Sequence, residues 1–515
     1  MPKDMPQQPE YAAIAQENVL LQGKVNELER QVAWFQKQVF GSKSERRLVG
    51  ENPQQMGLDG MVGDAPATLP VEKESITYER GKAKKNRADD CVTSSGLRFN
   101  DDVPVEVIPV VIPELTGTEA DQYEVIDTKL SHRLAQRPAS YVVLQYELPV
   151  VKRKSSGDII SAAAPSAVFD HSIADVSLLS GLLVDKFLYH LPLYRQHQRI
   201  QQAGIQLSRT TLTNLVKRSI DLLKPIVVAQ LKHVLQSKVL AVDETPIKAG
   251  RAGKGKMKTG WFWPVYGEAD EVVFTFSNSR ARQHLDDTLK PHFSGTLISD
   301  GYAAYARYAE QTEGVTHAQC WTHTRRQYIE AEADEPVSVA WALEMIGQLY
   351  QVETEIEKKK LTGEKKRDYR LLHSKPKVDT FFEWCEGQCE RVDLLPDNPL
   401  IKAINYTLTK TTALRVFLEN PDVPLDTNHL ERALRPIPMG RRNWLFCWTE
   451  LGAEHVGVIQ SLICTCKLHQ VDPYTYLVDV LQRINLHPAK DVEALTPRLW
   501  KDKFAAVPLR SDLYR

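Results

Sequence analysis

Long apolar runs are missing from this chain of 515 residues. None approaches the length of about 18 residues that a membrane-spanning helix needs, and the polar N-terminus shows no positively charged stretch followed by an apolar one. Charge of one sign is not in excess either, since 65 Lys and Arg residues face 66 Asp and Glu residues and the net charge is −1. These absences predict a soluble, cytoplasmic protein without a membrane partner, whose contacts with polyanions come from local basic patches.

Cysteine is scarce as well. The 7 cysteines are an odd number, and the two close pairs, Cys385/Cys389 and Cys464/Cys466, have no matching second pair at the spacing of a zinc site. We therefore expect reduced thiols of a cytosolic protein, with a metal or redox role as the alternative.

The chain shows no internal repeat and is too long for one core, so it should divide into several domains. Residues 1–45 carry a heptad pattern. Its positions alternate at spacings of four and three, with one Asn among them: Ile14, Asn18, Leu21, Val25, Leu28, Val32, Phe35 and Val39. This pattern favours a parallel, leucine-zipper-like coiled coil and hence a homo-oligomer. An amphipathic helix packed on its own domain is the alternative, which Gly23 keeps open because it weakens the helix.

Three regions follow the zipper. Residues 46–90 are rich in Gly, Pro, Ser and charge, and we expect a flexible basic linker there. Residues 91–170 contain stretches in which apolar and polar positions alternate, which predicts a small β-rich module. Residues 171–230 predict a helical DNA-binding region of helix-turn-helix type, in which Gly204 supplies the turn and Ser208 caps the second helix.

The second helix of this region would begin with Arg209 and carry Asn214 one turn later. Side chains of this kind lie where a recognition helix meets base edges or phosphates. Plain packing of two capped helices is the alternative.

Residues 231–445 predict a ribonuclease H-like α/β catalytic domain. The expected elements are strands 238–247, 259–267 and 271–277, a helix near 281–290 and a strand 295–299. Three strands followed by alternating helix and strand favour this fold type. A helical insertion is expected over about 335–420, and residues 446–515 should form a C-terminal helical region. The predicted fold class is therefore multidomain and mixed.

Three carboxylates stand where a metal site can form. Asp243 and Asp300 each end an apolar strand, and Glu431 lies on a short helix that Pro436 is predicted to end. If the two strands are neighbours, the acids converge and can hold two Mg²⁺ ions about 3.5 to 4 Å apart. Glu244 is a rival ligand, but alternation along a strand sends adjacent side chains to opposite faces, so Asp243 is preferred. For each acid taken singly, a structural role is the alternative.

Basic side chains near these acids predict a DNA-binding surface. Lys254, Lys256 and Lys258 lie in a Gly-rich segment that should form a hairpin tip. The other candidates lie near the second and third acids: Arg325, Arg432, Arg435, Arg441 and Arg442, with His323 and Asn428 as auxiliary residues. Such cations bind phosphates largely without regard to base sequence, and His323 could transfer a proton. Solvated surface charge and a merely structural histidine are the alternatives.

Several motifs resemble one family. They are His190-Leu191-Pro192-Leu193-Tyr194-Arg195-Gln196, Val242-Asp243-Glu244-Thr245, Ser299-Asp300-Gly301-Tyr302, Cys320-Trp321-Thr322-His323-Thr324-Arg325-Arg326, Asn428-His429-Leu430-Glu431-Arg432-Ala433-Leu434-Arg435-Pro436 and Gly440-Arg441-Arg442-Asn443-Trp444-Leu445-Phe446. With the zipper, these motifs resemble the large transposase of the insertion-sequence-sixty-six family of bacterial elements.

This resemblance implies a DDE-type DNA transposase of ribonuclease H fold. Its triad would be Asp243, Asp300 and Glu431, with Asp243 contacting two Mg²⁺ ions, or Mn²⁺ in their place, and each of the other acids contacting one. Members usually carry a cysteine-rich zinc module before the helix-turn-helix, whereas residues 92–237 contain no cysteine. No structural zinc is therefore expected.

The predicted function is transposition. The protein would bind the terminal inverted repeats of its element, cut by metal-activated water and join the freed 3′-hydroxyl to target DNA. The resemblance allows small accessory proteins of the same element as partners and places the protein in the bacterial cytoplasm at the nucleoid. The alternatives are a catalytically inactive DNA-binding regulator derived from a transposase and a zipper-driven scaffold, and the three intact acids argue against both.

Overall fold

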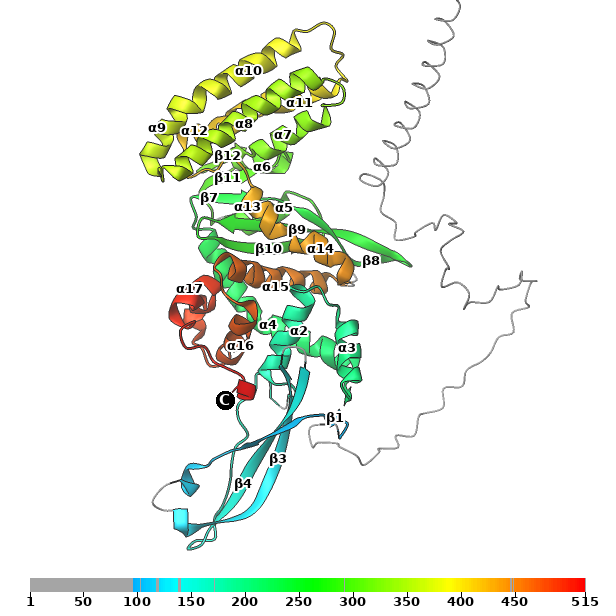
Figure 1. Cartoon of the computed structure of the whole chain (residues 1–515), viewed down its shortest axis with the longest axis vertical. Helices are drawn as coiled ribbons and strands as arrows, with labels where there is room; N and C mark the ends of the chain where they lie inside the picture. The colour runs from blue at the N-terminus through cyan, green and yellow to red at the C-terminus, as the bar shows by residue number, and fades with distance from the viewer. Residues whose placement is uncertain are drawn as a thin grey trace, which may run out of the picture. The chain divides into compact units, whose positions relative to one another are not determined.

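The structure is a computed structural model. It describes residues 96–514 except 102, 117–119, 138–139, 171, 291, 445–446 and 448. The expected zipper and linker lie outside the described residues. Within them the chain is a mixed α/β structure with three sheets (Figure 1). None of the described helices combines the length and the apolar character that a membrane span requires.

A long hairpin dominates the first described module. Strands β3 (Tyr123–Arg137) and β4 (Ser140–Arg153) pair antiparallel. The other edge of β4 carries β2 (Val105–Pro109) in parallel and β5 (Ile159–Ser161) antiparallel. β-branched and aromatic residues favour such strands, and the fully buried Tyr146 lies in the small core that they enclose.

Three helices follow this module. They are α2 (Val176–Phe187), α3 (Leu193–Gln202) and α4 (Arg209–Val234), and the short strands β1 (Arg98–Phe99) and β6 (Ile205–Gln206) pair beside them. Gly204 adopts a φ of +81°, which favours glycine, in the turn between α3 and α4. Ser208 Oγ accepts a hydrogen bond from a backbone N–H of the first turn of α4 at 3.0 Å. The predicted turn and cap are therefore confirmed.

The central sheet has the strand order β10-β9-β7-β11-β12. Its strands are β7 (Val239–Val242), β9 (Lys256–Gly267), β10 (Glu271–Ser277), β11 (Gly295–Ser299) and β12 (Val315–Gln319). β7, β9 and β10 are antiparallel neighbours, whereas β7, β11 and β12 run parallel. Strand β8 (Thr245–Gly253) pairs with β9 in a hairpin that projects beyond the sheet (Figure 1).

The prediction of one continuous strand over 238–247 is wrong. The chain breaks at Asp243 and Glu244, between β7 and β8, so four strands rather than three precede the next helix. Asp243 Oδ1 accepts a hydrogen bond from the backbone N–H of Glu244 at 2.7 Å, and the Glu244 side chain is buried. Both strands pair with β9 in one register, with Val242 opposite Val265 and Thr245 opposite Phe262, so the two acids interrupt the strand without shifting it.

Helix α15 (Glu450–Leu468) packs against β10 and α4 (Figure 1). Gly457 permits this close approach, because a Cβ there would lie 2.5 Å from the carbonyl oxygen of Phe274. Helix α16 (Pro473–Arg483) packs on α2, and the carboxylate of Asp472, the residue before it, caps its first turn. The shorter helices are α5 (Gln283–Leu289), α6 (Ala303–Glu310), α7 (Trp321–Glu330) and α17 (Pro497–Lys503).

Five helices lie between α7 and the segment that carries Glu431, and they gather beyond one edge of the central sheet (Figure 1). They are α8 (Pro336–Lys358), α9 (Gly363–His373), α10 (Lys375–Cys389), α11 (Pro399–Leu408) and α12 (Thr411–Glu419). Their apolar faces meet in a core that includes Ile346 and Phe381.

The prediction that Pro436 disfavours helical geometry at Arg435 is wrong. Helix α13 (Asn428–Leu434) is followed by α14 (Pro436–Asn443), and Arg435 between them has φ −47° and ψ −38°. A proline fits the first position of a helix, where no N–H is needed. Helix α13 thus ends before Pro436 as predicted, but Pro436 starts a second helix directly after it.

One buried cation ties the insertion to the segment that follows it. The side chain of Arg370 on α9 is 0% exposed, and its Nε and NH2 donate to the two carboxylate oxygens of Glu353 at 2.8 and 2.7 Å. NH1 donates to three backbone carbonyls, those of Phe417, Asn420 and Val423, at 2.7, 3.2 and 3.0 Å. Arg370 thus fixes the chain that leads from α12 towards α13.

We expect Arg370→Met to lower the free energy of unfolding by about 3 to 5 kcal/mol, because a partly buried carboxylate and three carbonyls lose their partner. Urea unfolding followed by circular dichroism measures this. The control is Arg367→Met on the same helix, where the side chain is partly exposed and pairs with Asp368, and the expected change is below about 0.5 kcal/mol. Equal stability of the two variants would contradict the role of Arg370.

Candidate active site

The two aspartates follow neighbouring parallel strands. β7 and β11 pair with Ala241 opposite Ile298. Two residues further along each strand come Asp243 and Asp300, at the carboxyl ends of both strands. Adjacent strands lie about 4.8 Å apart, so the two side chains start from neighbouring backbone positions. The predicted condition that the two strands be neighbours is therefore met.

Glu431 reaches the same place from helix α13. A cavity of about 360 Å³ lies at this edge of the sheet. Its lining is formed by Asp243, Glu244, Arg280, Asp300, His323, Arg326, Glu431, Leu434, Arg435 and Pro438. The three acids singled out from the sequence thus line one cavity, although they come from three separate segments of the chain.

Asp426 fixes the start of the helix that carries Glu431. Its Oδ1 accepts a hydrogen bond from the backbone N–H of Asn428 at 3.0 Å, and its Oδ2 accepts from Asn428 Nδ2 at 2.6 Å and from Thr322 Oγ1 at 3.2 Å. The backbone N–H of Trp321 donates to Leu425 O at 3.1 Å. Asn428, predicted as an auxiliary site residue, therefore lies outside the cavity lining and helps to orient α13.

Burial and the neighbouring acids raise the pKa of Asp243. Burial, and then the negative charges of Asp300, Glu244 and Glu431, raise the pKa of Asp243 to about 7. A carboxyl group that is reluctant to ionise beside other carboxylates marks a site where negative charge is not fully neutralised by the protein. Such a site attracts a cation.

The prediction that Glu244 faces away from the site is wrong, because it lines the same cavity as Asp243. Its hydrogen bonds nevertheless set it apart. Arg280 donates to Glu244 Oε1 through Nε at 2.8 Å and also through NH2. Tyr305 donates from its hydroxyl to Oε2 at 2.5 Å. Both oxygens of Glu244 are thus engaged within the protein, which leaves Asp243 as the freer acid of the pair.

Glu431 keeps one oxygen without a hydrogen bond. Its Oε1 is buried and accepts none, while His323 Nε2 lies 3.5 Å away and Arg326 NH2 lies 3.8 Å away. Burial lowers the pKa of His323. The ring is therefore neutral at pH 7 and can accept a proton.

The donor set suits a hard divalent cation, because carboxylate oxygens are the ligands that Mg²⁺ and Mn²⁺ prefer. The orphaned Oε1 of Glu431 and the raised pKa of Asp243 fit this use. Among the described residues, no three His, Cys, Asp or Glu side chains already stand in a cluster that could hold an ion. Mg²⁺ keeps several waters and is often held by one or two carboxylates, so such a cluster is not a requirement.

The predicted cations divide into two groups. Arg435 lines the cavity, whereas Arg325 is exposed and its neighbour Arg326 lines the cavity instead. The basic lining residues that were not among the predicted site residues are Arg280 and Arg326. Arg326 belongs to the motif that was singled out, so helical spacing on α7 could have found it. No sequence pattern around Arg280 marks it as a site residue, because only the tertiary fold brings it to the cavity.

The remaining predicted DNA contacts lie outside this cavity lining. Lys254, Lys256 and Lys258 are exposed at and beside the β8–β9 tip, where Gly255 has a φ of +71°. Lys258 also pairs with Glu450 at 3.2 Å. Exposed side chains are likewise present at the start of α4 and on α13 and α14, namely Arg209, Asn214, Arg432 and Arg442. Arg441 donates to the backbone carbonyl of Pro246 at 2.9 Å and so ties α14 to β8.

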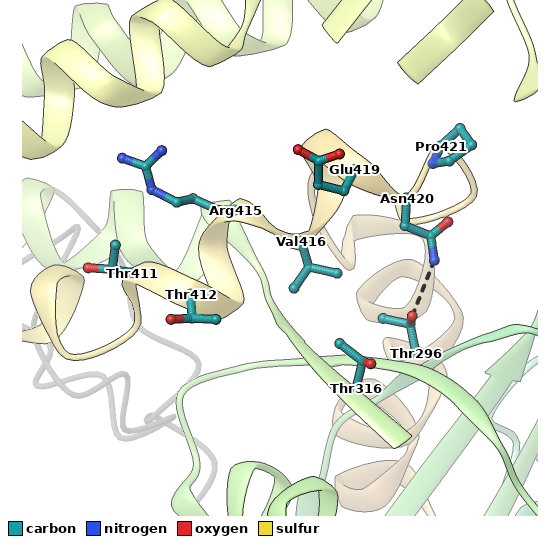
Figure 2. A pocket seen from close by; sticks show the side chains of 9 residues that line it. All are labelled: Thr296, Thr316, Thr411, Thr412, Arg415, Val416, Glu419, Asn420 and Pro421. Carbon is teal, nitrogen blue, oxygen red and sulfur yellow. Dashed lines mark hydrogen bonds between the residues drawn. The ribbon is translucent and has the colours of Figure 1, made fainter. Parts of the chain in front are cut away.

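A second cavity, of about 730 Å³, lies beside α12 and the starts of β11 and β12 (Figure 2). Asn420 Nδ2 donates to Thr296 Oγ1 there at 3.3 Å (Figure 2). Arg415 lines it but pairs with Asp379. None of the three predicted acids lines this cavity.

Comparison with known proteins gives the family. A family model described as "Transposase IS66 family" matches residues 171–455, one described as "IS66 C-terminal element" matches 461–498, and one described as "Transposase C of IS166 homeodomain" matches 27–108. The uncharacterized protein y4hP of Sinorhizobium fredii is 27% identical over 508 residues, which cover 93% of this chain and 89% of y4hP. The uncharacterized protein y4jD of the same organism is 31% identical over 375 residues, 68% of this chain and 70% of y4jD. Because the first family match spans more than half of the chain, this protein belongs to the transposase IS66 family.

Proposed function

We propose that this protein is a DDE-type DNA transposase that cleaves DNA at the terminal inverted repeats of an insertion sequence and joins the freed ends to target DNA. Family membership implies action on DNA and a divalent metal cofactor. The observation that carries the finer proposal is the convergence of Asp243, Asp300 and Glu431 on one cavity. The order of the central sheet, antiparallel on one side of β7 and parallel on the other, supports a ribonuclease H-like core.

The proposed chemistry follows from the donor set. Two Mg²⁺ ions, or Mn²⁺ in their place, would activate the attacking oxygen and stabilise the leaving oxygen. Asp243 is assigned to both ions, and Asp300 and Glu431 to one each. His323, which lines the cavity and whose pKa is lowered by burial, would take a proton from the attacking water or 3′-hydroxyl. Arg326 and Arg435 line the same cavity and would hold the phosphate backbone there.

Surfaces away from the cavity would position the DNA. The exposed start of α4, with Arg209 and Asn214, is assigned to the element ends, and the β8–β9 tip to backbone phosphates. The zipper over residues 1–45 would join copies of the chain, since cutting and joining two ends requires two active sites in one complex. Small accessory proteins of the element remain predicted partners, in the bacterial cytoplasm at the nucleoid.

The first test removes one acid. We expect Asp243→Asn to reduce cleavage of duplex DNA that carries the element's own ends by about 100-fold or more, because the ions lose their shared ligand. Gel analysis of end-labelled DNA in Mg²⁺ or Mn²⁺ measures this, with the melting temperature as a check on folding. The control is Asp287→Asn, since Asp287 is an exposed acid on α5 that bonds Gln283.

Three outcomes separate the candidates. Loss of cleavage in Asp243→Asn with normal activity in Asp287→Asn supports the assignment. Equal cleavage by Asp243→Asn and the unchanged protein would refute it. Binding of the ends by the unchanged protein without cleavage in either metal would instead favour a catalytically inactive regulator, the reading that the missing zinc ligands favour.

The second test uses pH. Asp243 has a folded pKa of about 7 against an ordinary 3.8, so below pH 7 a proton competes with a metal for the same oxygens. We expect the affinity for Mn²⁺ to rise by up to about tenfold per pH unit below pH 7 and to level off above it. Mn²⁺ titration followed by electron paramagnetic resonance or calorimetry measures this.

Asp243→Asn should change stability as well, with a definite sign. The unfolded chain releases the Asp243 proton near its ordinary pKa of 3.8 and the folded chain near 7, so ionisation penalises the folded state increasingly from pH 4 to 7 and fully above pH 7. Without metal at pH 8, Asp243→Asn should therefore melt at a higher temperature than the unchanged protein. Added Mn²⁺ should stabilise only the unchanged protein, and equal stabilisation of both would contradict the site.

A further inference from the structure

Arg280 stands out among the cations of the cavity because the protein holds it rigidly. It lies between β10 and α5, in a loop that the family motifs do not include. Its Nε and NH2 both donate to Glu244 Oε1, and the Glu244 side chain is 1% exposed. Since a buried carboxylate has no freedom to move, it fixes one edge of the guanidinium.

Two aromatic rings fix the plane of the same group. The Cζ of Arg280 lies 4.1 Å from the ring centroid of Tyr302 and 5.0 Å from that of Trp261. The Tyr302 hydroxyl donates to the backbone carbonyl of Arg280 at 2.7 Å. Cation–π contacts of this kind add to the hydrogen bonds in orienting an arginine.

The remaining edge of the guanidinium is available. NH1 of Arg280 makes no hydrogen bond or ion pair within the part of the chain that the structure describes, and the side chain is 43% exposed. Arg280 lines the cavity together with Asp243 and Asp300. If Arg280 served only to pair with Glu244, its guanidinium would not need an exposed edge in this cavity.

The geometry points to Arg280 as a phosphate-binding residue of the active site. We propose that NH1 donates a hydrogen bond to a non-bridging oxygen of the phosphate that is cut and joined, and so stabilises the charge that builds up there as the attacking oxygen bonds to phosphorus. This inference rests on the proposed function. The residue forms no covalent bond and transfers no proton, because arginine stays protonated.

Arg326 lines the cavity too but is held differently. Arg326 is 52% exposed in its side chain, and the carboxylate nearest to it is that of Glu431, at 3.8 Å. A flexible arginine must be ordered when the reaction begins, whereas a donor that is already fixed acts without that reorganisation. Arg280 is therefore the cation whose removal should affect the chemical step rather than DNA affinity.

The experiment compares Arg280→Ala and Arg280→Lys with the unchanged protein on two DNA substrates. One carries the natural scissile phosphate at the element end, and the other carries an uncharged methylphosphonate at the same position. On natural DNA we expect Arg280→Ala to lower the single-turnover cleavage rate by about 10²- to 10³-fold, with DNA affinity nearly unchanged. Arg280→Lys keeps the charge but loses the planar fork, so its rate should lie between the two.

The methylphosphonate separates phosphate binding from a structural role. If NH1 contacts the phosphate charge, the rate ratio between the unchanged protein and Arg280→Ala should fall towards one on the uncharged substrate. A ratio that is the same on both substrates, or an Arg280→Ala variant as fast as the unchanged protein on natural DNA, overturns the proposal. Arg282→Ala is the control, since Arg282 lies outside the cavity lining and pairs with Asp286.

Two further outcomes are possible: Arg280→Ala does not fold, or the unchanged protein does not cleave DNA. If circular dichroism shows that Arg280→Ala does not fold, Arg280→Lys is used in its place. The rate ratio between the unchanged protein and Arg280→Lys is then compared on the natural and the methylphosphonate substrate. If the unchanged protein cleaves neither substrate in Mg²⁺ or Mn²⁺, the proposed function fails and this inference fails with it. That result is distinct from normal cleavage combined with an inert Arg280.

Discussion

The parallel pairing of β7 with β11 is the constraint on which the site depends. It sets Asp243 and Asp300 side by side at one edge of the sheet, where like charges repel and burial disfavours ionisation, as the raised pKa of Asp243 reflects. A fold tolerates such a pair only when the strands beneath it are firmly held. Here β7 and β11 are buried in the middle of the sheet, with all four residues of β7 inaccessible to solvent. The apolar strands therefore offset the repulsion at their ends.

The third acid is held from two directions. On one side, Asp426 and the chain fixed by Arg370 orient α13. On the other, Trp444 at the end of α14 donates from Nε1 to the backbone carbonyl of Lys186 on α2 at 2.7 Å and packs on Phe187. Gly440 leaves room for the indole, because a Cβ there would collide with it. The helical pair that carries Glu431 is thus joined to α2, which packs in turn on α4.

Local patterns predicted the parts of this site that depend on neighbours in sequence. Apolar runs ending in an acid located Asp243 and Asp300, and glycine and serine at set positions located the turn and cap before α4. The predictions that failed concern features that depend on residues distant in the sequence. The break after β7 is stabilised by Glu244, whose partners Arg280 and Tyr305 lie 36 and 61 residues away. The helical geometry of Arg435 likewise goes against the local preference of the residue before proline, and α14 begins directly after it.

Asp243 and Glu244 show how one dipeptide can serve two opposite needs. Both carboxylates line the same cavity, but Asp243 is left to its acidic neighbours, whereas Glu244 pairs with Arg280 and accepts a hydrogen bond from Tyr305. The second carboxylate does not weaken the site by adding uncompensated charge, because its partner is a cation that lines the same cavity. Glu244 thereby fixes a positive group within reach of the space that the acids surround. A rigidly held cation that lines the same cavity as Asp243, Asp300 and Glu431 would suit the proposed displacement at a phosphodiester, since it could stabilise charge on the phosphate without reorganising.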